Sequence, residues 1–135
     1  MHTIPPMRIR ILLAICAVLL AIPAVAAAIT RTGEFTAGFA ATTHTPTVNA
    51  RWPYVVSAKS LSGKALKASV HLQVFQNGKR VDIVGWRQFK GTYKSFKRWP
   101  PSTRGQTYVF QALVISTGAN NRKATIKLNY AVTPR

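Results

Sequence analysis

The end of the chain carries the clearest hydrophobic pattern. Between residues 123 and 132, apolar and polar residues alternate, with Ile126 and Leu128 on the apolar face, and residues 107–117 are rich in aromatic and β-branched side chains. Period-two alternation of this kind is typical of half-buried β-strands. Residues 118–122 tolerate positive φ, so they predict the turn of a hairpin. A lone hairpin is marginal in water, so further strands have to cover its apolar face.

Four further strands are predicted upstream, over residues 52–58, 67–75, 80–86 and 93–99. Residues 76–79 place Asn-Gly between two of them, which is the strongest short hairpin signal. A two-residue turn there predicts the pairs Gln76–Lys79, Val74–Val81, Leu72–Ile83, Gln73–Asp82 and His71–Val84. The apolar pairs share one face, so the turn and the hydrophobic pattern agree on the register. Residues 87–91 and 100–106 are expected to be loops.

The N-terminus has the pattern of a secretory signal peptide over residues 1–28. Basic residues precede an unbroken apolar run that starts at Ile11, and Pro23 and small alanines follow it. Cleavage after Ala26 or after Ala28 fits equally well, and an uncleaved membrane anchor is the alternative. Cys16, the single cysteine, lies in this leader. The remainder is therefore expected to be secreted or held in the cell envelope, without an internal disulfide.

The exported part divides into two regions. Residues 29–50 are rich in Thr, Ala and Gly without a sustained period, which predicts a linker with a short edge strand at 45–49. Residues 51–135 carry six predicted strands, and the edge strand at 45–49 would be a seventh. Their spacing of roughly a dozen residues is typical of an immunoglobulin-like β-sandwich. The predicted fold class is thus all-β: an immunoglobulin-like sandwich of antiparallel strands, preceded by a signal-peptide helix.

Several segments make this prediction more particular. They are Tyr54-Val-Val-Ser-Ala-Lys-Ser-Leu-Ser-Gly63, Ala68-Ser-Val-His-Leu-Gln-Val74, Gly91-Thr-Tyr93, Pro101 and Tyr108-Val-Phe-Gln-Ala112. The arrangement resembles the bacterial Ig-like modules of secreted and surface proteins, including the invasin/intimin type, although Ser60 and Ala65 stand where Asp and Pro are common in that family. The resemblance implies surface presentation or binding, and it implies no catalytic residues.

The charge points to anionic partners. Of the 135 residues 19 are Lys or Arg and only 2 are acidic, giving a net charge of +17. Such an excess favours phosphates, carboxylated glycans or anionic surfaces as partners, and a solvating surface without a specific partner is the alternative. We expect anionic envelope polymers or glycans, or another envelope protein. Nucleic acid is not an expected partner, and membrane contact is expected only through an uncleaved leader.

Catalytic and metal-binding groups are scarce. The acids are Glu34 and Asp82, too few for paired-carboxylate hydrolysis. The predicted hairpin places His71 and Asp82 on one face, and Ser69 completes a triad on paper, but an open sheet offers no pocket for it. The histidines and acids lack metal-ligand spacing. We therefore expect no enzyme activity, no cofactor and no metal.

One segment combines basic and aromatic residues, from residue 86 to residue 104. The candidate polyanion-binding residues are Arg87, Lys90, Lys94, Lys97, Arg98 and Arg104, interleaved with Trp86, Phe89, Tyr93, Phe96 and Trp99. Cations beside aromatic faces suit a polyanion with stackable rings. The alternative is that the aromatics fill the core and the charges are solvated. The expected function is a non-catalytic envelope binding or structural module; a secreted cationic effector acting on membranes or nucleic acid is the alternative.

Overall fold

The structure, a computed structural model, describes residues 27–117 and 121–135. Within these ranges the chain forms eight β-strands and one turn of 3-10 helix, η1 (Pro101–Thr103). The strands are β1 (Ala27–Thr32), β2 (Thr36–Ala41), β3 (Trp52–Lys59), β4 (Lys67–Gln76), β5 (Lys79–Lys90), β6 (Thr92–Lys97), β7 (Tyr108–Ser116) and β8 (Ala124–Val132). The expected signal-peptide helix lies outside the described residues, except that Ala27 and Ala28 begin β1.

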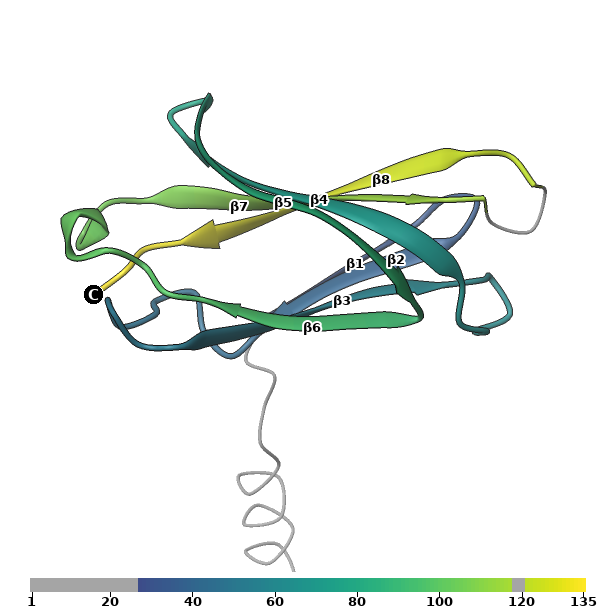
Figure 1. Cartoon of the computed structure of the whole chain (residues 1–135), viewed down its shortest axis with the longest axis horizontal. Coiled ribbons are helices and arrows are strands. Elements are labelled where there is room, and N and C mark those ends of the chain that lie inside the picture. Colours follow the sequence, from purple (N-terminus) through teal and green to yellow (C-terminus); the bar gives the residue numbers. More distant parts are fainter. Residues whose placement is uncertain (1–26, 118–120) are drawn as a thin grey trace, which may run out of the picture.

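The strands form a β-sandwich of two antiparallel layers (Figure 1). The lower layer in Figure 1 has the order β1-β2-β3-β6, and the upper layer has the order β5-β4-β7-β8. Strand β5 crosses from the upper to the lower layer, where Lys90 pairs with Thr92 and joins the two layers at one corner. No helix in the described part of the chain is long and apolar enough to cross a membrane.

An aromatic core fills the space between the layers. The ring of Phe39 lies 5.6 Å from that of Tyr54, 5.5 Å from that of Phe110 and 5.0 Å from that of Tyr130, centroid to centroid. Burial alternates along β7 and β8, with Ile126 and Leu128 inside. The predicted closing hairpin is therefore confirmed, although part of its turn, residues 118–120, lies outside the described ranges.

The prediction of a linker over residues 29–50 is wrong for its first half. Strands β1 and β2 occupy residues 27–41 and extend the lower layer beyond β3. Phe35 and Phe39 are fully buried in the core. Eight strands are therefore present in the described ranges where six to seven were expected, and Phe39 of β2 packs on Phe110 and Tyr130 of the opposite layer.

The predicted edge strand at residues 45–49 does not form. This segment is irregular, but its backbone is anchored to the C-terminus: Val48 N donates to Arg135 O at 2.9 Å, and Arg135 N donates to Pro46 O at 2.8 Å. These bonds tie the connection between β2 and β3 to the end of the chain.

The Asn77-Gly78 turn forms as predicted, but the register beyond it is shifted. Both turn residues have positive φ, 51° and 77°, and Gln76 pairs with Lys79. Two irregularities then add residues to β5, so Val74 pairs with Asp82 instead of Val81. A β-bulge puts two residues opposite one and turns the following side chains to the other face. Val81 and Ile83 are consequently about half exposed, at 52% and 51%, rather than buried.

The corner between β5 and β6 depends on Gly91. The residues expected to form a loop, 87–90, continue β5, and the strand predicted at 93–99 ends at Lys97. Gly91 is buried with φ +76°, and a Cβ there would lie 2.8 Å from the Cβ of Ala65. Its carbonyl accepts a hydrogen bond from Ala58 N at 2.9 Å. Only glycine fits this positive φ and this close approach without strain.

Candidate functional site

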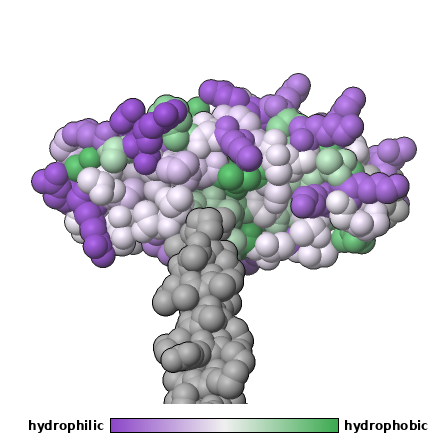
Figure 2. All heavy atoms as spheres, turned by 90° about the horizontal axis from the view of Figure 1, so that it is seen from below, coloured by the Kyte–Doolittle hydropathy of each residue, from purple (hydrophilic) through white to green (hydrophobic). Residues whose placement is uncertain are grey.

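The basic side chains are almost uncompensated by acids. The one ion pair in the described part of the chain joins Lys97 Nζ to Asp82 Oδ2 at 3.3 Å. The other acid is Glu34. Hydrophilic side chains project around the rim of the lower layer when the molecule is seen from below (Figure 2). Positive charge therefore dominates the surface of the described residues.

The six candidate residues do not share one surface. Arg87 and Lys97 pair with Val70 and Trp52, buried residues, and so lie on the inward-facing sides of their strands. Lys90 lies at the corner, Lys94 and Arg98 lie with Phe96 on the outer side of the lower layer, and Arg104 follows η1. The aromatics divide as well, because Trp99 is buried in the core whereas Trp86 and Phe96 are exposed. These residues are close together in the sequence, but the fold distributes them over different surfaces.

Part of the predicted set does form a compact cluster on the lower layer. The guanidinium carbon of Arg51 lies 4.0 Å from the centroid of the Phe96 ring, and that of Arg98 lies 5.7 Å from it. Lys94 and Pro53 join Arg51 and Phe96 around a surface hollow of about 450 Å³. We call this group, Arg51, Pro53, Lys94, Phe96 and Arg98, the Phe96 cluster.

The strand register explains the Phe96 cluster. Pro53 of β3 pairs with Phe96 of β6, and Val55 pairs with Lys94, so these side chains share the outer face. Arg98 is fixed by a hydrogen bond from its Nη1 to Asn49 O at 2.8 Å. Guanidinium groups held over an aromatic ring keep their charge and most of their N–H donors for an anion. The cluster is thus an exposed cationic surface whose guanidinium groups are held in place.

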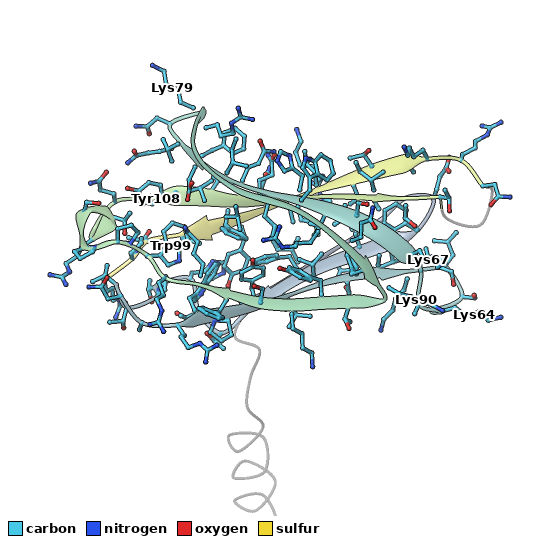
Figure 3. All side chains as sticks on the ribbon, in the orientation of Figure 1. Lys64, Lys67, Lys79, Lys90, Trp99 and Tyr108 are labelled. Carbon is cyan, nitrogen blue, oxygen red and sulfur yellow. The ribbon has the colours of Figure 1, made fainter. Side chains whose placement is uncertain are left out.

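A second cationic hollow lies on the outer face of the upper layer. Lys67, Lys90 and Lys123 line it together with Ser69, Gln88 and Phe89, among others, and its volume is about 510 Å³. Lys67 pairs directly with Lys90 across β4 and β5, at the end of the sandwich where β5 turns into β6 (Figure 3). Like charges placed opposite each other on a sheet are destabilising. A bound anion would relieve that repulsion. We call this the lysine hollow.

A third hollow opens where β5 and β6 diverge. It has a volume of about 260 Å³ and contains the Asp82–Lys97 pair beside Trp99 and Tyr108. Lys97 Nζ lies 5.0 Å from the centroid of the Trp99 ring, and Figure 3 places Trp99 and Tyr108 near each other at that end. Because the cation here is already paired with a carboxylate, this hollow offers less unpaired positive charge than the other two.

The structure separates the His71–Asp82 pair on which a hydrolase would depend. The His71 ring stacks on Trp86, with centroids 4.4 Å apart and planes 1° apart. Asp82 instead accepts hydrogen bonds from Lys97 Nζ and from Ile83 N. The bulges in β5 cause this, since they move Asp82 to the opposite side of the strand. No group of three metal-ligating side chains occurs among the described residues.

The residues with shifted pKa values belong to the core. Burial raises the pKa of Tyr54 above its ordinary value of 10.0, and burial does the same for Tyr130. Both side chains are almost fully buried. These shifts report on packing and not on a reactive surface.

Sequence reasoning missed three cationic members of these surfaces. Arg51 was placed just before the strand predicted at residues 52–58, and Lys67 and Lys123 were placed at strand ends. Only the pairing of β3 with β6 brings Arg51 to Phe96. The alternating pattern of β4 gave a usable signal for Lys67, since a lysine next to a buried alanine has to face outward.

Comparison with known proteins adds nothing to these observations. No protein-family model matches the chain, and no curated protein or solved structure is similar enough to match it.

Proposed function

We propose that this protein is a non-catalytic, immunoglobulin-like module that is exported and retained on anionic polymers of the cell envelope. The observation that carries the proposal is the charge balance: 19 basic residues face 2 acids. Only one ion pair consumes any of that charge in the described ranges. The Phe96 cluster and the lysine hollow are the places where a polyanion would contact the protein.

Strand order supports the immunoglobulin-like part of the proposal. Strands β2-β3-β6 form one sheet and β5-β4-β7-β8 form the other. This corresponds to strands A-B-E and C′-C-F-G of an immunoglobulin-type sandwich, with β1 added beside the first strand. The segments that resemble invasin/intimin-type modules fall on β3, β4, β6 and β7. A surface-presented module of that kind is the subfamily we propose.

The distribution of charge favours envelope retention over the action of a secreted membrane or nucleic-acid effector. The Phe96 cluster lies on the outer side of the lower layer, and the lysine hollow lies on the upper layer. An effector that acts on a flat membrane would gather its cations on one face. A chain with anion sites on both faces suits a three-dimensional polymer network, in which binding releases counterions from the polymer.

Graded salt extraction of isolated envelopes tests the proposal. We expect the protein to elute progressively as NaCl rises, because counterion release weakens binding with the logarithm of the salt concentration. A variant carrying Arg51→Gln and Arg98→Gln should elute at lower salt. The matched control, Lys59→Gln with Lys64→Gln, removes the same charge outside the Phe96 cluster and should elute close to wild type. Retention that is unchanged up to about 1 M salt would contradict electrostatic binding.

The export step has its own check. Mass spectrometry of the protein recovered from envelopes gives the mature N-terminus. A mature chain that begins at Ala27 keeps β1 whole, because β1 starts at that residue. If the protein is recovered only from the cytoplasm, the proposed export and retention in the envelope are wrong.

A further inference from the structure

A row of amide side chains crosses the outer face of the upper layer. Gln111 of β7 pairs with Gln73 of β4 and with Asn129 of β8, so the three side chains stand side by side. Arg80 Nη1 donates to Gln73 Oε1 at 3.2 Å, Gln73 Nε2 donates to Gln111 Oε1 at 3.4 Å, and Gln111 Nε2 donates to Asn129 Oδ1 at 2.9 Å. We call Arg80, Gln73, Gln111 and Asn129 the amide row.

The amide row has unused hydrogen-bonding capacity. Each carboxamide carries two N–H donors and two acceptor lone pairs, and the row uses one N–H and one lone pair of Gln111. Asn129 is exposed and accepts one bond within the row. Every bond runs in the same direction, so the groups polarise one another. Donors and acceptors that alternate at this spacing match a ligand with several hydroxyl groups.

A neutral hollow borders the amide row. Its volume is about 450 Å³, and Gln111 and Asn129 line it together with Phe75, Val109, Asn77 and Thr107. The hairpin between β4 and β5 rises above the layer beside it (Figure 1). No charged side chain lines this hollow, which sets it apart on a protein of net charge +17. The apolar side chains of Phe75 and Val109 and the amides of Gln111 and Asn129 together suit one sugar ring. The volume of the hollow lies within the range of small-ligand pockets.

The outer face of the upper layer extends from the amide row toward the lysine hollow. On the other side of the amide row, Trp86 stands against His71 and is 53% exposed. Its second ring face points away from β4, because His71 covers the first. Beyond it lies the lysine hollow, which, like the neutral hollow, is lined by residues of β4 and β7. A ligand that spans this face meets hydroxyl-binding amides at one end and ammonium groups at the other.

We propose that the outer face of β5-β4-β7-β8 binds a carboxylated polysaccharide, with one sugar ring in the neutral hollow and carboxylates at the lysine hollow. This rests on the proposed retention on anionic polymers and names the class of polymer. Polyphosphate offers charge without hydroxyl groups or rings, so it would contact the lysines and leave the amide row empty. A carboxylated polysaccharide would contact both the lysine hollow and the amide row.

Binding of two defined polymers separates the two sites. The full chain is titrated with hyaluronate, which carries carboxylates and hydroxylated rings, and with inorganic polyphosphate of similar charge, at one fixed salt concentration. We expect a variant with Gln111→Ala and Asn129→Ala to bind hyaluronate at least tenfold more weakly and to bind polyphosphate as wild type does. The control is Thr125→Ala, an exposed residue on the same face of β8 but outside the amide row; it should change neither affinity. Thermal unfolding of each variant establishes that it is folded.

The outcomes distinguish the inference from the proposed function. If wild type and the double variant bind hyaluronate equally, the sugar site is wrong while polyanion retention stands. If the wild type binds neither polymer, both proposals fail. If the double variant loses hyaluronate and polyphosphate together although its melting temperature is unchanged, the two amides contribute to binding any polyanion and the sugar site is again wrong. A selective loss of hyaluronate binding supports it.

Discussion

At the scale of single residues, the core contains polar atoms whose hydrogen-bonding capacity is not used. The hydroxyl of Tyr130 and the indole N–H of Trp99 are both buried without a hydrogen-bond partner among the described residues. Leaving such a group unsatisfied costs about 1–3 kcal/mol. Tyr130 stays in place because its ring packs on Phe39 and His44. Aromatic bulk, and not the hydroxyl, is what this position supplies.

We therefore expect Tyr130→Phe to be stabilising. At pH 7 its free energy of unfolding should rise by about 1 kcal/mol, because an unpaired hydroxyl is removed without changing the ring. Burial raises the pKa of Tyr130 above 10.0, so the unfolded chain loses this proton first. Wild type should then lose stability as pH rises above 10, and the variant should lose less. Urea unfolding at pH 7 and at pH 10.5 measures both effects.

The control is Tyr108→Phe. The Tyr108 hydroxyl donates to Gln106 Oε1 at 3.4 Å, so its removal should be neutral or destabilise by up to about 1 kcal/mol. A Tyr130→Phe variant that is less stable than Tyr108→Phe would mean that the Tyr130 hydroxyl has a partner in solution.

At the scale of elements, the corner between β5 and β6 holds the two layers in register. Gly91 N donates to Leu66 O at 2.9 Å, and Ala58 N donates to Gly91 O at the same distance. Through these two hydrogen bonds, Gly91 connects β3 to the segment before β4. One residue therefore links the two layers. The Phe96 cluster depends on it indirectly, because the register of β6 against β3 sets which side chains face outward.

Gly91→Ala should destabilise the protein by about 2 kcal/mol or more, because it combines a positive φ with a methyl group 2.8 Å from the Cβ of Ala65. Adding Ala65→Gly removes the clash and leaves the strained φ. The double variant should therefore recover part, but not all, of the lost stability in a double-mutant cycle. Full recovery would show that backbone strain at Gly91 is negligible. No recovery would show that the close approach does not matter.

At the scale of the whole molecule, charge opposes folding. A net charge of +17 on 135 residues repels itself most strongly in the compact state. Stability rests on the aromatic core, since the sequence has a single cysteine, Cys16, and no internal disulfide can form. The surface therefore holds charge that its own fold would be more stable without, which is consistent with a requirement for binding.

We expect the melting temperature to rise as NaCl increases from about 10 mM to about 200 mM, because salt shortens the range of the repulsion. Differential scanning fluorimetry measures this. A variant with Lys59→Glu and Lys64→Glu should melt higher at low salt and gain less from added salt. A melting temperature that falls with salt would mean that attractive ion pairs, and not repulsion, dominate the electrostatics of the folded chain.

Much of the architecture could be read from local patterns. The β7–β8 hairpin was predicted because Ile126 and Leu128 alternate with polar residues, and the Asn77-Gly78 turn because few residues other than Asn and Gly accept its positive φ. Strands β1 and β2 were missed because Ala and Gly give little hydrophobic signal. The burial of Phe39 in β2 depends on Phe110 and Tyr130 of the opposite layer, which a local pattern does not contain.

The sequence by itself determined an all-β chain, its excess of positive charge and its shortage of acidic residues, because alternation, turn residues and composition are local properties. Tertiary structure alone decided which charged and polar side chains lie together. Pairing of β3 with β6 brings Arg51 to Phe96, and pairing of β4, β7 and β8 aligns Gln73, Gln111 and Asn129 into one row. The bulges in β5 move Asp82 away from His71. Each of these depends on register between strands, which no single strand encodes.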